Sequence, residues 1–124
     1  SYLVSGMLPI TPEDLKSAGM EEDQLLEVLQ YALWRLESVQ QWSRDNIFSG
    51  LKSVADALDI KLKPFLAPLF IAIAGSSASI SVMDSMNLLG ADMSRARLRH
   101  AIDLLGGVGK KKLKKMEKAY QQLT

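Results

Sequence analysis

Apolar residues recur at three- and four-residue spacing through most of this chain, and that period constrains the fold more than any other feature. The pattern is clearest between residues 21 and 40, where the apolar positions are Leu25, Leu26, Leu29, Leu33, Leu36 and Val39. Residues at this spacing lie on one face of an α-helix, so we expect a long helix there with one buried face. A second helix is predicted over residues 43–59, with Ser43 as its cap and a close packing contact at Gly50.

Helix start and stop signals flank further apolar segments. The run Thr11-Pro12-Glu13-Asp14 combines a hydroxyl cap, a proline at the first helical position and acids in the first turn, which is typical of a helix start. Gly19 is typical of a helix end. After a turn of small residues, Ser79 is a candidate cap for a helix through Met83 and Leu89. Two more helices are expected, at residues 92–105 and 110–123.

Residues 62–74 form the most apolar stretch and predict a buried central helix. Pro68 stands inside this stretch, and an interior proline kinks or breaks a helix. A strand over residues 69–74 is therefore the alternative for its second half. Since no other segment shows the alternation typical of strands, the expected fold class is all-α, a multi-helix bundle.

The inventory of reactive side chains excludes most kinds of catalytic site. The chain has no cysteine and a single histidine, His100. A thiolate metal site and a disulfide therefore lack their residues. For a catalytic triad, no serine can be paired with a second histidine or with an obvious orienting carboxylate. The run from Gly106 to Lys111 departs from the phosphate-binding loop pattern, because Leu104 stands at the first glycine position and Lys111 where Ser or Thr binds magnesium. We expect no catalytic residue, no metal site and no cofactor in this chain.

The distribution of apolar residues predicts no membrane partner. No apolar run approaches the roughly 18 residues of a membrane span, and no signal-peptide pattern opens the chain. The absence of cysteine is compatible with a reducing cytoplasm, and we expect a cytoplasmic location. The chain begins at Ser1 rather than at a methionine, which suggests a fragment or a trimmed tag.

Charge is distributed unevenly along the chain, although the net charge is only +1. Residues 1–60 hold ten acids and four bases, a net of −6, whereas residues 61–89 hold two bases and one acid, a net of +1. Residues 90–124 hold nine bases and three acids, a net of +6. Such asymmetry favours an anionic partner for the C-terminal part. Ordinary helix surfaces followed by a solvated tail are the alternative.

The basic residues of the C-terminal part fall into two clusters. Arg95 and Arg99 share a helix face at four-residue spacing, while Arg97 points elsewhere. Two guanidiniums on one face suit phosphate contacts; salt bridges to the acidic first half are the alternative. The second cluster comprises Lys110, Lys111, Lys112, Lys114, Lys115 and Lys118. We expect these lysines to wrap much of a helix and attract anions diffusely, or to form a solvated or disordered tail.

An ordered set of motifs between Trp42 and Leu105 resembles the C-terminal anticodon-binding region of bacterial-type glutamyl-tRNA synthetases. In the order of the family, the motifs are Trp42 with Ile47 (W-x4-I), Leu51-Lys52 with Val54-Ala55 (L-K-x-x-A), Lys61 before Ala67 to Gly75 (P-L-R-x-A-x-T-G), Leu88-Leu89-Gly90 and Arg97-Leu98. Residues 1–41 agree more loosely, in the order of their predicted helices.

The resemblance implies two all-helical anticodon-binding subdomains that form a cage around the anticodon loop. Residues 1–60 would be the tail of the first subdomain, residues 61–109 the second, and residues 110–124 a basic tail. It also implies that the partner is a tRNA, that of glutamate. A catalytic domain that uses ATP and magnesium would precede this part in the parent, a glutamate–tRNA ligase. This part would not be catalytic and would supply tRNA affinity and selection.

The family's anticodon contacts carry over to Phe70, Ser79, Ile80 and Val82, with Lys52 as a nearby basic contact. Arg95 and Arg99 join them as candidate RNA-binding residues from the charge pattern. Phe70 replaces the family's arginine, so it lacks the hydrogen bonds of a guanidinium, but its ring can stack on an unpaired base or be buried. The alternative function is a helical domain that has lost anticodon reading and acts as a protein-interaction module.

Overall fold

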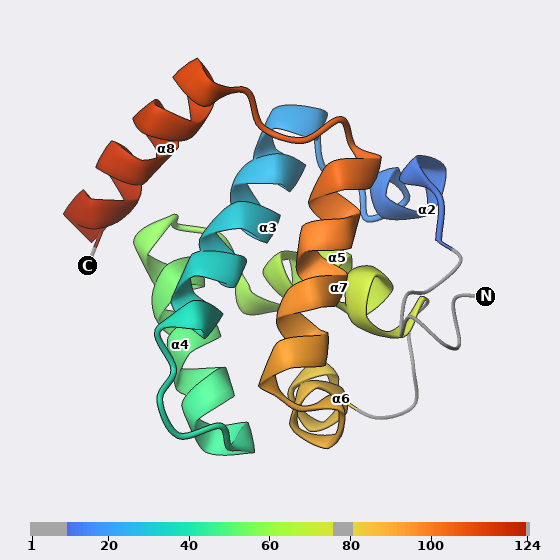
Figure 1. Ribbon diagram of the computed structural model, residues 1–124, viewed down its shortest axis with the longest axis vertical. Helices are drawn as coiled ribbons and strands as arrows, with labels where there is room; N and C mark the ends of the chain where they lie inside the picture. The colour runs from blue at the N-terminus through green and yellow to red at the C-terminus, as the bar shows by residue number, and fades with distance from the viewer. Residues whose placement is uncertain (1–9, 76–80, 124) are drawn as a thin grey trace.

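Seven α-helices make up most of residues 10–75 and 81–123, the part of the chain that the computed structural model describes (Figure 1). They are α2 (Pro12–Lys16), α3 (Glu22–Glu37), α4 (Arg44–Ala57), α5 (Leu62–Ala74), α6 (Val82–Leu89), α7 (Ala91–Leu104) and α8 (Lys110–Leu123). No strand occurs in these described residues. The prediction of an all-α fold is therefore confirmed, including the two long helices expected over residues 21–40 and 43–59.

Side-chain caps fix where three of the helices begin. In α2, Thr11 Oγ1 accepts from the Asp14 N–H at 3.2 Å and the Asp14 carboxylate accepts from the Thr11 N–H at 2.8 Å, a reciprocal capping box. Ser43 caps α4 as predicted, by accepting from the Asn46 N–H. The cap of α6 is Ser81, which accepts from the Asp84 N–H at 3.1 Å. The prediction of Ser79 as that cap is wrong, and Ser79 itself lies outside the described residues.

Pro68 lies inside a continuous helix, so the alternative strand over residues 69–74 is wrong. An interior proline costs a helix about 3 kcal/mol. Burial offsets that cost here, because Phe65, Leu69 and Ile73 are all fully buried and Pro68 is itself buried. Gly75 ends α5 in the left-handed conformation, at φ 84°, and its N–H donates to the Ile71 carbonyl.

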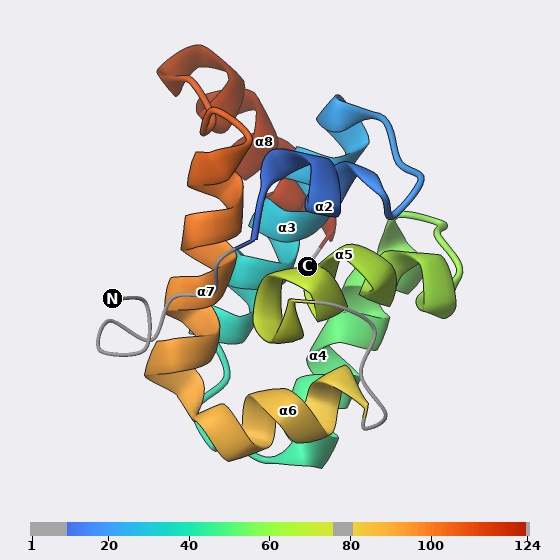
Figure 2. The same cartoon turned by 90° about the vertical axis from the view of Figure 1, so that its right-hand side faces the viewer.

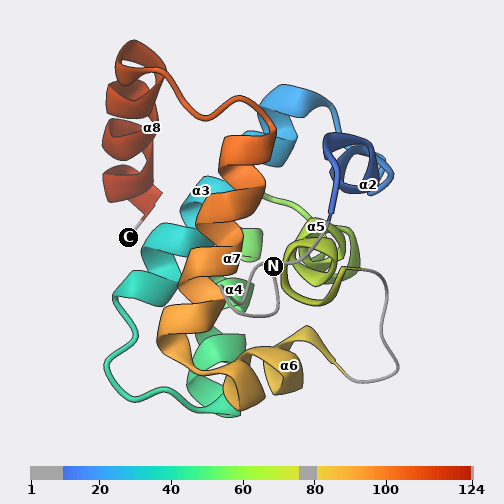
Figure 3. The same cartoon turned by 45° about the vertical axis from the view of Figure 1, so that its right-hand side comes forward.

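Helix α3 lies at the centre of the fold, between α4 and α7 (Figure 1). Helix α5 contacts α3, α6 and α7, and α2 packs against α5. Figures 2 and 3 show α8 on the opposite side of α3 from α2 and the C-terminal end of α5. None of the helices in the described ranges combines the length and apolarity needed to cross a bilayer.

The described helices share one hydrophobic core. It includes Leu15 of α2, Leu29 of α3, Leu51 of α4, Leu69 of α5, Met86 of α6, Leu98 of α7 and Met116 of α8. The predicted parts 1–60 and 61–109 thus meet in a common core, and their division into subdomains stays a prediction. The close contact predicted at Gly50 is confirmed, because a Cβ atom on Gly50 would lie 3.0 Å from Arg35 Cγ.

Helix α8 is docked on α3 by an aromatic cluster. The centroid of the Tyr120 ring lies 5.4 Å from that of Tyr31 and 5.3 Å from that of Trp34, and Met116, also in α8, is buried in the core. The Arg35 guanidinium lies 5.9 Å from the Tyr120 centroid, within the range of a cation–π contact. Burial raises the pKa of Tyr31, and the neighbouring Glu27 raises it further. Residues 110–123 are therefore a docked helix rather than a disordered tail.

Replacing Tyr120 with alanine should release α8 from α3 without unfolding the remaining helices. Aromatic pairs contribute about 0.5–1.5 kcal/mol each beyond their buried area, and Tyr120 takes part in two such pairs. Hydrogen–deuterium exchange should become faster at residues 110–123 and stay unchanged in α3. The matched variant Tyr120→Phe keeps the ring and should keep the protection. If Tyr120→Ala loses protection throughout α3, or if α8 keeps its protection, Tyr120 does not dock α8 on α3 in the way described.

Candidate nucleic-acid interface

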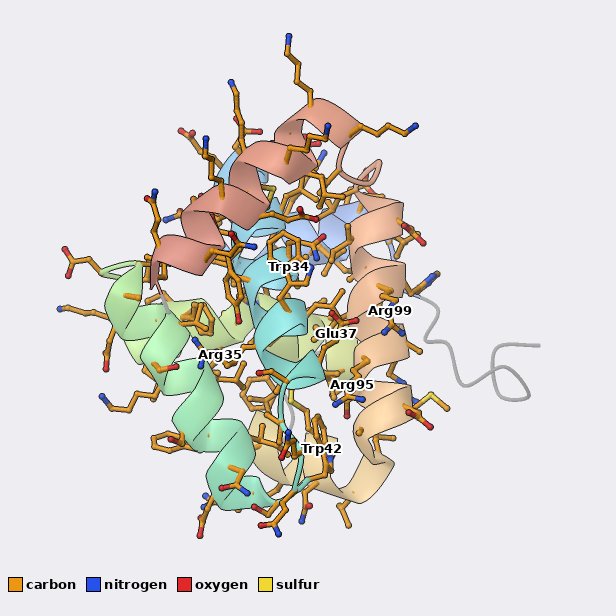
Figure 4. The ribbon with its side chains drawn as sticks, turned by 60° about the vertical axis from the view of Figure 1, so that its left-hand side comes forward. Trp34, Arg35, Glu37, Trp42, Arg95 and Arg99 are labelled. Atoms are coloured by element: carbon orange, nitrogen blue, oxygen red, sulfur yellow. The ribbon has the colours of Figure 1, made fainter. Side chains whose placement is uncertain are left out.

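Arg95 of α7 holds the C-terminal end of α3. Its Nε and Nη2 atoms both donate to the Leu36 carbonyl oxygen, at 3.2 and 2.7 Å, and Nη2 also donates to the Val39 carbonyl at 3.4 Å (Figure 4). The last carbonyls of a helix lack partners within the helix and carry partial negative charge. A planar guanidinium with several donors satisfies this site, so Arg95 stabilises the end of α3.

Trp42 extends this contact to α6. The Arg95 guanidinium lies 5.5 Å from the Trp42 ring centroid, a cation–π geometry. The indole Nε1 donates to the Met86 carbonyl at 3.0 Å, and the buried Ser94 hydroxyl donates to the same carbonyl at 3.2 Å. The segment after α3, the last turn of α6 and the first turns of α7 are therefore connected through Trp42, Met86 and Arg95.

The other two arginines of α7 also contact neighbouring helices. Arg97 donates to the carbonyl of Ile73, near the C-terminal end of α5. Burial lowers the pKa of Arg97, but a guanidinium remains protonated in proteins. Arg99 Nη2 lies 2.9 Å from the Glu37 carboxylate, in an exposed ion pair. The face that Arg95 and Arg99 are predicted to share is thus turned toward α3. The Arg99–Glu37 contact is a salt bridge to the acidic first half of the chain, which is the alternative to a phosphate contact. Any contact of these arginines with RNA stays a prediction.

Phe70 lies half-buried in the wall of a pocket between α2 and α5. The pocket has a volume of about 860 Å³ and is lined by Asp14, Ser17, Ala18, Leu62, Lys63, Leu66, Ala67, Phe70, Ile71 and Gly75. We call it the Phe70 pocket. Its lining is largely apolar, with the exposed Lys63 as its basic residue. Neither Lys52 nor Arg95 lines it, so Phe70 is not grouped with these two predicted RNA contacts.

The remaining predicted site residues are dispersed. Lys52 is exposed on α4 and pairs with Asp56 at 2.9 Å. Val82 is the first residue of α6, and its side chain is fully buried. Ser79 and Ile80 lie outside the described residues. The roles of all four in RNA binding stay predictions. Within residues 10–75 and 81–123, no group of three acidic or histidine side chains is placed to hold a metal ion.

The lysines of α8 do not wrap the helix as predicted. Five of them are exposed on the side away from α3, and we call them the lysine face: Lys110, Lys111, Lys114, Lys115 and Lys118. Lys112 differs, because its Nζ pairs with the Asp23 carboxylate at 2.6 Å. The signal for this arrangement is present in the sequence. Positions 110, 114 and 118 recur every four residues on one side, and Met116 and Tyr120 mark the other.

Comparisons with known proteins identify relatives over nearly the whole chain. Residues 1–102 match the family model described as "Anticodon binding domain". A protein of Saccharophagus degradans named glutamate–tRNA ligase is 53% identical over 124 residues, which is 100% of this chain and 25% of the relative. Proteins of the same name from a Marinomonas species and a Psychrobacter species are 51% and 55% identical, over 98% and 88% of this chain and 25% and 22% of the relatives. The chain thus spans about a quarter of the length of these relatives.

Replacing Arg95 with alanine should lower the free energy of unfolding by about 1.5–3 kcal/mol, the usual contribution of hydrogen bonds to a charged group. Arg95→Lys should recover only part of this stability, because an ammonium lacks the planar fork that reaches Leu36 and stacks on Trp42. The control Arg99→Ala removes an exposed ion pair and should cost at most about 1 kcal/mol. Urea unfolding of the purified variants measures these differences, and equal effects of Arg95→Ala and Arg99→Ala would show that Arg95 does not hold α3.

Proposed function

The chain belongs to the anticodon-binding domain family, and from this we infer that it binds tRNA. The relatives are named glutamate–tRNA ligases, so we propose a glutamate tRNA as the partner, recognised at its anticodon loop. The chain would supply affinity and tRNA selection to a longer ligase. The catalytic domain of that ligase would use ATP and magnesium and act in the cytoplasm, where tRNAs are charged.

The Phe70 pocket is the observation that carries this proposal. Proteins read RNA loops by stacking on splayed bases and by hydrogen bonds to base edges. A volume of about 860 Å³ lies within the range of small-molecule sites, and the half-buried Phe70 ring offers a stacking surface in its wall. Lys63 adds a positive charge suited to a phosphate. Gly75 also lines the pocket, and Ser79 and Ile80, which the resemblance assigns to the anticodon, follow it closely in the sequence.

Arg97 supports this surface from behind without facing the RNA. Its hydrogen bond to the Ile73 carbonyl fixes the end of α5 two residues before Gly75. Arg95 acts in the same way on α3, with which α5 is in contact. Arg97 therefore positions one of the two helices that build the pocket, and Arg95 acts only on the neighbouring α3. The exposed Lys52 and Arg99 would contribute as secondary contacts in this proposal, and Val82, whose side chain is fully buried, would contribute only through its backbone.

The same pocket also favours the alternative function, a protein-interaction module that does not read the anticodon. Its largely apolar lining would accept an apolar side chain of a protein partner as well as a base. Phe70, which stands where the family has an arginine, makes the lining more apolar. A test must therefore compare RNAs that differ in the loop alone.

Replacing Phe70 with alanine should weaken binding of the anticodon stem-loop of a glutamate tRNA by about tenfold or more. Loss of base–aromatic stacking costs roughly 1–3 kcal/mol per base. A hairpin with the same stem and a short closed loop should bind equally to the parent chain and to the variant. The matched control Phe48→Ala removes a half-buried ring of α4 that does not line the pocket, and it should not discriminate between the two RNAs.

Fluorescence anisotropy with labelled RNAs measures these affinities, and circular dichroism verifies that each variant is folded. Equal weakening of both RNAs by Phe70→Ala would contradict loop recognition at this pocket. Unchanged binding of the stem-loop would do the same and would favour the protein-interaction module.

A further inference from the structure

The lysine face of α8 is a strongly charged surface that lies apart from the Phe70 pocket. Residues 110–124 contain six lysines and one glutamate, a net charge of +5. Lys112 pairs with Asp23, and burial raises the pKa of nearby Glu27 while the Lys112 ammonium lowers it. The five lysines of the lysine face are instead exposed to solvent.

The orientation of the lysine face is fixed by the docking of α8. Met116 is buried in the core, and the Tyr120 ring packs against both Tyr31 and Trp34. The helix therefore cannot turn its lysines toward the acidic residues of α3 without breaking this packing. Side chains that end in nitrogen extend from α8 away from the other helices in Figure 4.

We propose that the lysine face binds the phosphate backbone of RNA, at a part of the tRNA other than the anticodon loop. Ammonium groups contact phosphates as point charges and carry no base specificity. Helix α8 contains no arginine, and its tyrosine faces α3, so this face lacks groups that stack on bases. The inference rests on the proposed function, because tRNA supplies the polyanion.

The position of α8 makes this contact separate from the first. Helix α8 lies across α3 from α2 and the end of α5, which flank the Phe70 pocket (Figures 2 and 3). One short loop does not reach both surfaces, but a folded tRNA with a stem adjoining the loop offers phosphates over a longer distance. The tRNA would thus be held by recognition at the pocket and by charge at the lysine face.

An RNA backbone fits this face better than an anionic membrane does. A membrane-surface helix needs a free apolar face to insert among the lipids. The apolar face of α8 is already occupied, because Met116 is buried in the core and Tyr120 packs on α3. The lysine face therefore offers charge without an inserting surface, which suits a solvated phosphate chain.

The test is the salt dependence of tRNA binding in a pair of charge-matched variants. Lys114→Gln/Lys118→Gln removes two charges from the lysine face, and Lys16→Gln/Lys61→Gln removes two exposed charges from outside α8 and the Phe70 pocket. The slope of log affinity against log salt should be shallower by about 2 for the first variant, roughly one for each phosphate that is no longer neutralised by a lysine. The second variant should keep the parental slope.

Two further measurements separate an oriented face from mere charge. The first double variant should weaken the closed-loop hairpin and the anticodon stem-loop by the same factor, whereas Phe70→Ala should discriminate between them. The experiment can therefore contradict phosphate binding by the lysine face while loop recognition at the Phe70 pocket holds, and the reverse. Tyr120→Ala, which keeps every charge of the lysine face, should weaken binding of full-length tRNA because the face is no longer held in place.

Three outcomes would overturn the inference. An unchanged salt slope in Lys114→Gln/Lys118→Gln would show that these lysines do not contact phosphates. Equal slopes in the two double variants would show that charge acts regardless of position. Tighter binding of the parent chain to vesicles of phosphatidylglycerol and phosphatidylcholine than to tRNA, abolished in the α8 variant, would assign the lysine face to a membrane surface.

Discussion

The guanidinium of Arg95, hydrogen-bonded to the Leu36 carbonyl at the end of α3, is the contact on which the arrangement of the helices depends. Helix α3 is central, and the last carbonyls of a helix lack the N–H partners that continue the helix. The Leu36 carbonyl accepts a backbone hydrogen bond from the Val39 N–H at 3.3 Å, and Arg95 adds two charged donors to it. Arg95 also donates to the Val39 carbonyl, stacks on Trp42, and through Trp42 connects to the last turn of α6. Arg97, two residues later, points to a different side of α7 and donates to the Ile73 carbonyl near the end of α5. One helix with alternating arginines thus fixes the ends of two others.

This arrangement divides the basic residues by their chemistry. The arginines of α7 serve the architecture, where a planar group with several donors can satisfy carbonyls and stack on a ring. The lysines of α8 remain in solvent, where a compact ammonium suits contact with a mobile phosphate chain. The surface that we propose to read bases contains neither the arginines of α7 nor the lysines of α8. It is the Phe70 pocket, one wall of which is α5, and Arg97 holds α5 near its C-terminal end.

Sequence patterns predict those features of the fold that depend on interactions between residues close in the sequence, such as helix extents and caps. The three- and four-residue apolar period predicts the extents of α3 and α4 to within a few residues, and the Thr11 and Ser43 caps follow from their hydroxyl groups at the helix starts. The turn of small residues favours Ser79 as a cap, but Ser81 has an acid three residues later at Asp84, the capping pattern that decides between them. The strand alternative at Pro68 fails because burial of α5 outweighs the local cost of the proline. The partners of Arg95 lie 59 and 56 residues away, so no local pattern could distinguish a helix-holding arginine from an RNA-binding one.

An NMR titration of the ¹⁵N-labelled chain with tRNA examines this division of roles in a single experiment, because the Nε–H of an arginine gives its own signal. With tRNA in excess, the Arg95 Nε–H should keep its chemical shift and its slow exchange, since it remains bonded to the Leu36 carbonyl. Backbone amides near Phe70 and Gly75 and along α8 should shift. If instead the Arg95 Nε–H shifts and loses its protection on binding, the guanidinium leaves α3 for the RNA, and its role as the structural centre of the fold is wrong.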